Sequence, residues 1–423
     1  CNMAVKEKME LTGNPFVDTG LGVIASLANL DDMNELTLSH LNSIYGNGDQ
    51  ITMWNSNLKS FTQIFGTNNP LYQYSYGFKK GKGPSETNKA IYKSILEGLL
   101  SEIGESTNGE RCWACGALSN FDFAKVCKKA IESCGKKAPR DKWVGRDWFP
   151  LAGSLGSDAQ SLPAASRPPN ICPKCLFAMH FLPIGLILLN GRLTAFQCTS
   201  SEFWYELLRD IVNENKTRIT SGNYDTLGTR EGSQAFIKRL LVLFKRLQKE
   251  VSYTEAPEAL YVWRFTNSGA SPDCALEEIP NQALEFLSEA AKKGVEREIM
   301  DLLKFEGKNP KYSLYQCILD KRDYTNLYSE GKRKGASPEL FALYETLVCG
   351  HSPRALRTAH KLAKKMSEQI GEKQLQRIQR REAFKEPRVQ NQFRALMAGM
   401  AKEGELMLAN YLDLFPLREG RGI

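Results

Sequence analysis

Two Cys-x₂-Cys pairs constrain this chain more than any other feature of its sequence. Cys112 and Cys115 form the first pair, Cys172 and Cys175 form the second, and 56 residues separate the pairs. Each pair can turn so that two thiolates meet one ion, and four thiolates complete the tetrahedral shell of a structural zinc site. Because such a shell leaves no open position, we predict one structural Zn²⁺ per chain and no catalytic metal.

The length of the spacer predicts what the zinc ion would do. A compact zinc ribbon separates its pairs by only ~15–20 residues, so we expect the ion to clip together a long insertion at about residues 104–180. Two alternatives stay open, namely four unliganded thiols and a redox pair of the thioredoxin kind, although the latter needs one pair in a βαβ context. Cys127, Cys134 and His180 are spare ligands, but the apolar run around His180 favours a packed histidine.

The positive charge of the chain is concentrated near its end. From residue 351 to 423 there are 15 Lys and Arg against 8 Asp and Glu, a net charge of +7, out of +8 for all 423 residues. A basic block of this kind suits a polyanion, since neutralised phosphates release their counterions. The alternative is an ordinary solvated helix face.

Hydrophobic patterns predict two regions, which we place at residues 1–278 and 279–423. The expected fold class is a mixed α/β (α+β) N-terminal region with a zinc-clipped insertion, followed by an all-α helical bundle. The first region should hold helices over 15–30, 32–45, 85–103, 202–213 and 234–251, a strand over 71–78, a hairpin over 186–197 turned by Asn190-Gly191, and a strand over 260–266. Ser337-Pro338 and Ser352-Pro353 each predict a helix start in the second region.

Motif searches give little support to a membrane protein or an enzyme. No apolar run reaches the ~18 residues of a membrane span, and no signal peptide opens the chain, so we expect a cytoplasmic protein without a membrane partner. The sequence lacks a phosphate-binding P-loop, a Gly-x-Ser-x-Gly elbow and a His-Glu-x-x-His helix. A binding protein is therefore the favoured interpretation, and an enzyme whose active site is assembled only by folding stays open.

Several segments together resemble the large subunit of type I-B CRISPR Cascade complexes. They are the Thr12-Gly-Asn-Pro-Phe-Val-Asp-Thr-Gly20 segment, both cysteine pairs, the loop from Ser157 to Pro163, and the Leu182-Pro-Ile-Gly185 segment that begins the hairpin. The resemblance extends over most of residues 11–280, and the helical remainder is similar in character to the small-subunit-like bundle that ends such subunits.

The resemblance implies a non-catalytic targeting component. In such complexes the large subunit contacts the 5′ end of the guide RNA (crRNA) and other Cascade subunits. It recognises the protospacer-adjacent motif in double-stranded target DNA, aids strand separation and stabilises the R-loop. It also supports recruitment of a helicase-nuclease, or in some systems a transposition protein. In such complexes the protein recognises the motif, and base pairing with the guide RNA recognises the remaining target sequence.

Motif reading needs hydrogen-bond donors in a groove and a wedge that parts base pairs. The best candidates surround a glycine-rich basic turn, and a half-buried sheet face is the alternative explanation for the tyrosines. They are Asn68, Asn69, Tyr74, Tyr76, Lys79, Lys80 and Lys82, with Gln160 and Ser161 as second choice. Asn14 and Asp18 are expected to be a helix cap and a first-turn carboxylate.

Binding of the DNA backbone needs positive charge and no base code. The candidates recur at three- and four-residue spacing, as on one face of a helix, and continue on the next predicted helix. They are Arg354, Arg357, Lys361, Lys364, Lys365, Arg377, Arg380 and Arg381. A stand-alone zinc-containing nucleic-acid-binding regulatory protein is the alternative function.

Overall fold

A computed structural model describes most of the chain. The described residues are 8–104, 108–139, 143–152, 169–224, 230–249, 255–267, 273–307, 309–328 and 334–369, with 391, 394–395, 398–399 and 401–402. The chain forms two compact units, the first made of Cys1–Gly232 and Pro257–Ile279 and the second of Ser233–Ala256 and Pro280–Ile423. The sequence-based division placed residues 1–278 in one region, whereas the structure assigns Ser233–Ala256 to the second unit.

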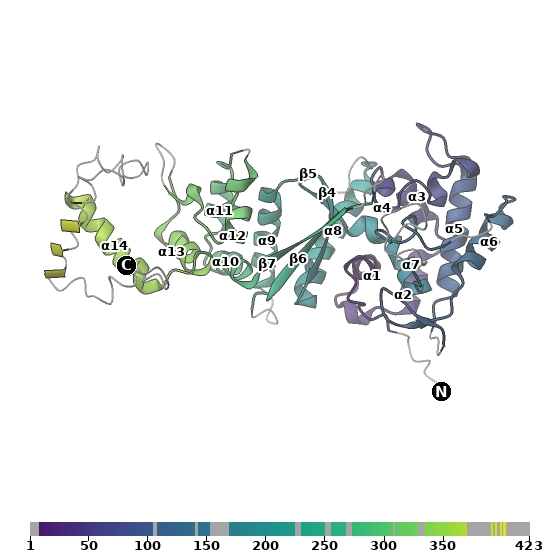
Figure 1. The fold of residues 1–423 in the computed structure, drawn as a ribbon, viewed down its shortest axis with the longest axis horizontal. Coiled ribbons are helices and arrows are strands. Elements are labelled where there is room, and N and C mark those ends of the chain that lie inside the picture. The colour runs from purple at the N-terminus through teal and green to yellow at the C-terminus, as the bar shows by residue number, and fades with distance from the viewer. Residues whose placement is uncertain are drawn as a thin grey trace, which may run out of the picture. The chain divides into compact units, whose positions relative to one another are not determined.

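The first unit combines helices with two small sheets (Figure 1). Its helices and 3₁₀ turns are α1 (Pro15–Leu27), η1 (Met33–Glu35), α2 (Leu38–Tyr45), α3 (Asp49–Asn57), α4 (Phe61–Phe65), η2 (Pro70–Tyr72), η3 (Tyr74–Tyr76), α5 (Glu86–Ser101), α6 (Phe123–Ser133), α7 (Pro173–Met179), η5 (Leu182–Gly185) and α8 (Ser201–Thr220). Its strands are β1 (Glu110–Arg111), β2 (Leu118–Ser119), β3 (Ile187–Leu189), β4 (Arg192–Cys198), β5 (Arg230–Glu231), β6 (Ala259–Thr266) and β7 (Asp273–Pro280).

Helix α1 lies at the centre of the first unit. The Asn14 side chain caps it by accepting hydrogen bonds from the backbone N–H groups of Phe16 and Val17, as predicted. Almost every residue of α1 is buried, because α7, α8 and η5 all pack against it. A Cβ atom at Gly20 would lie 2.0 Å from the carbonyl oxygen of Ala178 in α7. Only glycine allows this backbone approach.

The larger sheet has the strand order β5-β3-β4-β6-β7. Its centre is the predicted hairpin, in which Asn190 and Gly191 adopt φ values of 52° and 82°, as a type I′ turn requires. The predicted strand over 260–266 is β6, which pairs antiparallel with β4. Strand β5 adds a parallel edge to β3, and the sequence patterns had indicated neither β5 nor β7.

Two local predictions were wrong. Residues 71–78 form no strand but the two 3₁₀ turns η2 and η3, because Asn69 caps Pro70–Tyr72 and Gly77 ends the second turn with φ of 108°. Residues 32–45 do not form one helix, since Leu36 and Thr37 are extended between η1 and α2. The Thr37 side chain and the His40 ring form a capping box that restarts the chain as α2.

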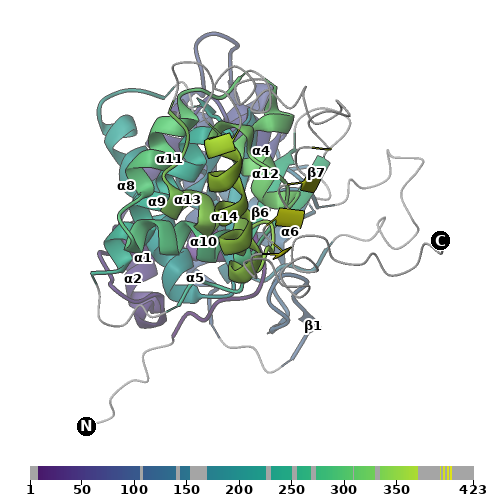
Figure 2. The ribbon, with the colours of Figure 1, turned by 90° about the vertical axis from the view of Figure 1, so that its left-hand side faces the viewer.

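In its described residues, the second unit consists of helices and 3₁₀ turns. These are α9 (Ser233–Leu247), α10 (Asn281–Lys292), α11 (Glu296–Leu303), η6 (Pro310–Tyr312), α12 (Leu314–Leu319), η7 (Thr325–Leu327), α13 (Pro338–Leu347) and α14 (Pro353–Gln369). Helix α10 packs against both α9 and α13, and α14 packs beside α13 (Figure 2). Ser337 and Ser352 cap α13 and α14, which confirms both predicted helix starts.

The apolar face of α9 explains why this helix joins the second unit. Phe236, Leu240 and Phe244 are fully buried, and α9 packs against α10 and α12. No helix in the described part of the chain is both long and apolar enough to cross a bilayer.

Candidate metal centre and nucleic-acid interface

The four paired cysteines converge on one point in the first unit. The Sγ atoms of Cys112, Cys115, Cys172 and Cys175 lie within 4.8 Å of one another, and Cys115 Sγ is 3.6 Å from Cys172 Sγ. Zn–S bonds of ~2.3 Å in a tetrahedron place neighbouring sulfurs about 3.8 Å apart. The four residues can therefore hold a tetrahedral metal ion with little movement.

A short hairpin presents the first pair. Strands β1 and β2 pair antiparallel, and Cys112–Ala117 form the loop between them. Cys112 N–H donates to the Ala117 carbonyl at 2.8 Å, and Gly116 N–H donates to the Cys112 carbonyl at 2.8 Å. Gly116 has φ of 74°, a left-handed conformation that lets the chain turn directly after Cys115.

The start of α7 presents the second pair. Cys172 is the N-cap residue, Pro173 occupies the first helical position, and Cys175 follows one turn later, fully buried. The backbone N–H of Cys172 donates to Cys112 Sγ at 3.3 Å, which joins the two pairs directly. Trp113 N–H also donates to the Asn170 carbonyl at 2.9 Å, so the hairpin and the segment before α7 are held together.

The chemistry of the cluster fits a divalent cation. Hydrogen bonds from the other three thiols lower the pKa of Cys112, while protons shared with Cys112 and Cys115 raise the pKa values of Cys172 and Cys175. Four thiolates cannot coexist this close without a compensating charge. A bound ion would supply this positive charge and hold the β1–β2 hairpin to α7, which is a structural role. The geometry supports a metal site and does not identify zinc among thiolate-binding metals.

The spare ligands lie outside this cluster. Cys127 is buried on α6, and His180 is fully buried against Phe65 and Trp148. The His180 Nδ1 atom is 2.8 Å from the Tyr92 hydroxyl oxygen, and burial lowers the pKa of His180 to about 3. His180 is thus a packed neutral histidine. Because Trp148 and Cys127 are also core residues, the described part of residues 104–180 contributes to the core of the first unit.

The basic turn forms a second feature of interest in the same unit. Lys79 and Gly83 bridge its base, where Gly83 N–H donates to the Lys79 carbonyl at 3.0 Å. Lys79, Lys80 and Lys82 are all exposed on it. Three ammonium groups therefore project from a closed turn of five residues.

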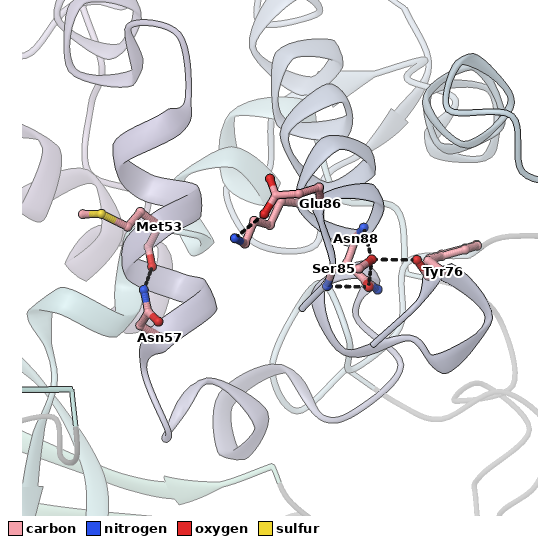
Figure 3. Close-up of polar contacts among 7 residues, drawn as sticks. Met53, Asn57, Tyr76, Ser85, Glu86 and Asn88 are labelled. Atoms are coloured by element: carbon pink, nitrogen blue, oxygen red, sulfur yellow. Dashed lines mark hydrogen bonds and ion pairs between the residues drawn. The ribbon is translucent and has the colours of Figure 1, made fainter. Parts of the chain in front are cut away.

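A buried asparagine anchors the segment before this turn. Asn88 is fully buried near the start of α5 and donates to the carbonyls of Pro70 and Gln73 at 2.6 and 2.9 Å. Ser85 caps α5 and lies 2.9 Å from the Tyr76 carbonyl (Figure 3). The segment before the turn is thus held against the first turn of α5, the helix that follows the turn. We had not predicted this anchor, although the Ser85-x-x-Asn88 spacing is that of a capping motif.

The other candidate motif-reading residues near the turn differ in their exposure to solvent. Tyr74 is 65% exposed and packs edge-on against Phe78, whereas Tyr76 is half-buried. Asn68 is exposed. Asn69 is fully buried, caps η2 and donates to the Asp147 carbonyl at 2.8 Å. The prediction that Asn69 reads DNA is therefore wrong, because its amide is already used inside the protein.

Helix α14 carries the predicted backbone-binding residues on its exposed side. Arg354, Arg357, Lys361 and Lys364 are exposed, and Ala355 and Thr358 form the buried side. Lys365 lies in the helix, but its side chain is outside the described part. Arg377, Arg380, Arg381, Gln160 and Ser161 lie outside the described residues altogether.

The segment from Thr12 to Gly20 is held in place by hydrogen bonds among its own residues. The buried Asp18 carboxylate accepts hydrogen bonds from Thr12 N–H at 2.6 Å and from Gly13 N–H at 2.9 Å. Burial raises the pKa of Asp18, and the hydrogen bonds from Thr12 and Gly13 act against that rise. Asp18 and Asn14 are therefore positioning residues of the segment that begins α1.

Comparisons of the chain with protein-family models, with curated proteins and with solved structures found no match.

Proposed function

We propose that this chain is a non-catalytic, nucleic-acid-binding subunit of an RNA-guided complex, of the kind formed by the large subunit of type I-B CRISPR Cascade. It would read a short motif in double-stranded DNA, aid strand separation and hold the opened strands. Its partners would be the 5′ end of a guide RNA, other Cascade subunits, and a helicase-nuclease or transposition protein. The proposal rests on the resemblance of residues 11–280 together with the surfaces described above.

The observation that carries the proposal is the anchored lysine turn. Lys79, Lys80 and Lys82 project from a closed turn, and buried Asn88 fixes the segment before it. Exposed Tyr74 packs against Phe78, the residue that precedes Lys79. Lysine ammonium groups can donate to guanine O6 and N7 in the major groove. An exposed aromatic ring can insert between base steps. Hydrogen-bond donors and an aromatic wedge are what motif recognition followed by strand opening needs, and Tyr74 is linked to the lysine turn through its contact with Phe78.

Helix α14 supports the second part of the proposal. Arg354, Arg357 and Lys361 are exposed at spacings of three and four residues. Such a face can contact successive phosphates without reading bases. The two surfaces thus offer motif recognition in the first unit and backbone contact in the second.

The cysteine cluster would support the turn indirectly. It holds the β1–β2 hairpin to α7, and α7 packs against α5, the helix that anchors the turn. We propose that the metal is zinc and that its role is structural, with Cys112, Cys115, Cys172 and Cys175 as its ligands.

Binding measurements on charge-reversed variants test the site. Lys79→Glu, Lys80→Glu and Lys82→Glu combined should lower affinity for motif-containing duplexes by at least about tenfold, since three donors become repulsive. The matched control reverses Lys125, Lys128 and Lys129, three exposed lysines of α6, and changes the net charge equally. Equal losses in both triple variants would refute the turn as the reading site.

Isolation of the chain from its native cells tests the assembly. We expect a tagged chain to purify with a short RNA of uniform 5′ sequence and with several partner subunits. The alternative function, a stand-alone zinc-containing nucleic-acid-binding regulatory protein, predicts tight, salt-sensitive binding by the isolated chain and no guide RNA. Recovery of the chain without RNA and without partner subunits would refute the proposed assembly. It would not bear on the lysine turn, which the charge-reversed variants test separately.

A further inference from the structure

A second group of metal-binding side chains lies in the second unit. One carboxylate oxygen of Asp323, one of Glu345 and the Sγ atom of Cys349 all lie within 4.8 Å of one another. Asp323 precedes η7, Glu345 belongs to α13, and Cys349 follows the end of that helix. The group is separate from the four cysteines and mixes oxygen and sulfur donors.

Backbone contacts explain why these three residues converge. The Tyr344 hydroxyl donates to the Arg322 carbonyl at 2.8 Å, which holds the chain before Asp323 against α13. Cys349 N–H donates to the Tyr344 carbonyl at 3.2 Å, and His351 N–H donates to the Glu345 carbonyl at 2.9 Å. The chain therefore folds back over Glu345 as α13 ends.

The Glu345 carboxylate is buried and only partly hydrogen-bonded. Its side chain is only 5% exposed, yet its Oε1 atom has no hydrogen-bond partner among the described residues. Its Oε2 atom is 2.7 Å from His351 Nδ1. A buried carboxylate oxygen without a partner is costly, and carboxylates in such positions are commonly satisfied by a bound cation.

We propose that Asp323, Glu345 and Cys349 bind one divalent transition-metal ion of the zinc class. His351 orients the Glu345 carboxylate as an outer-shell partner, and water completes the coordination. Carboxylate oxygen and thiolate sulfur are both zinc ligands, at about 2.0–2.2 Å and 2.3 Å. Tetrahedral bonds of these lengths place the ligand atoms about 3.4–3.8 Å apart, and the three atoms already lie within 4.8 Å of one another.

The site would differ from the cysteine cluster in kind. Asp323 is exposed and Cys349 half-buried, so the ion can enter from solvent and exchange a water ligand. Three protein ligands leave a position open, whereas four thiolates leave none. This inference does not depend on the proposed function, because it concerns only what the side chains can coordinate.

Metal stoichiometry tests the proposal. The full chain would be stripped with a chelator, dialysed to equilibrium against micromolar Zn²⁺, and analysed by elemental mass spectrometry with circular dichroism as a check of folding. We expect two zinc ions per chain in the parent protein and one in Asp323→Asn and in Cys349→Ser. The matched controls Asp301→Asn and Cys274→Ser replace an exposed carboxylate and an exposed cysteine elsewhere, and should retain two.

Asp323→Asn keeps the test valid even if Cys349→Ser folds poorly, because Asp323 is exposed. Replacement of zinc by Co²⁺ separates the sites further. Thiolate-to-cobalt absorption should fall by only about one fifth in Asp323→Asn, which loses one of five Co–S bonds, and much more in Cys112→Ser. A folded Asp323→Asn variant that binds as much zinc as the folded parent would overturn the proposal.

Discussion

The two basic surfaces of this protein are built in different ways. The lysine turn of the first unit is irregular backbone, fixed by the buried Asn88 amide through its bonds to Pro70 and Gln73. The exposed face of α14 in the second unit belongs to a regular helix. Its charges lie on one side only because basic residues recur every three or four positions. A surface that reads bases must hold its donors in one place, while a surface that contacts phosphates only needs charge. The construction of each surface therefore matches the role proposed for it.

Loss of a cluster cysteine should have the largest effect on stability, and it should destabilise the first unit while leaving the second unchanged. Cys112→Ser removes a proposed metal ligand that is only 2% exposed, and losing a structural metal typically costs on the order of 5 kcal/mol. We expect the first unit to unfold at a clearly lower temperature while the second unit is unchanged, as followed by calorimetry. Cys274→Ser, an exposed cysteine, is the control. A single transition shifted equally for both units would contradict this separation.

Asn88→Ala tests whether the anchoring of the lysine turn matters. It leaves two carbonyls without their buried partner and should cost about 3 kcal/mol in unfolding free energy. We also expect it to reduce discrimination between DNA motifs, although no charge is removed. Asn55→Ala is the control, because Asn55 is equally buried and bonds to Tyr92 and to the His180 carbonyl. If both variants bind DNA alike at equal stability, the anchor has no role in recognition.

The pH dependence of stability tests the core that supports the turn. Burial lowers the pKa of His180 to about 3 from 6.5, so the unfolded chain binds more protons between these values. Stability should therefore fall as the pH falls below about 6.5, by about 1.4 kcal/mol per pH unit from this residue. In His180→Phe, which preserves ring packing, denaturant titrations should show a shallower decline with acid. Parallel curves for the two proteins would contradict the assignment.

The smallest effect is expected from the α14 face. Removing two phosphate contacts with Arg357→Ala and Lys361→Ala should reduce the dependence of log affinity on log salt concentration by about 2, equally for all DNA sequences. The control pair is Lys292→Ala and Lys304→Ala, exposed lysines already paired with Glu289 and Asp301. A sequence-dependent loss in the α14 variant would contradict a pure backbone contact.

Local signals in the sequence predicted features that depend on a few neighbouring residues. The cap at Asn14 and the Asn190-Gly191 turn are of this kind. The two cysteine pairs converge from positions 56 residues apart, but each pair has its own local motif in the sequence. Alternating aromatics wrongly predicted a strand at residues 71–78, because Asn69 caps η2 and the Asn88 side chain, distant in the sequence, donates to the Pro70 and Gln73 carbonyls. Tertiary hydrogen bonds override period-two patterning in such a case.

Features made by long-range contacts had no local signal. The buried position of Asn69 depends on the Asp147 carbonyl, 78 residues away. The group of Asp323, Glu345 and Cys349 is spread over two segments joined by the Tyr344 hydroxyl. Helix α9 follows the first unit in the chain, but its apolar face has its partners in α10 and α12. Sequence spacing describes none of these contacts.

Selection of DNA by the protein in its purified complex tests the central claim most directly. A pool of duplexes with a randomised short motif beside a matched target would be bound, recovered and sequenced for the parent, the lysine-turn triple variant and the α14 double variant. We predict that the turn variant loses enrichment of any motif, while the α14 variant enriches the same motif as the parent with lower yield. Retention of the parent motif by the lysine-turn variant would contradict the account.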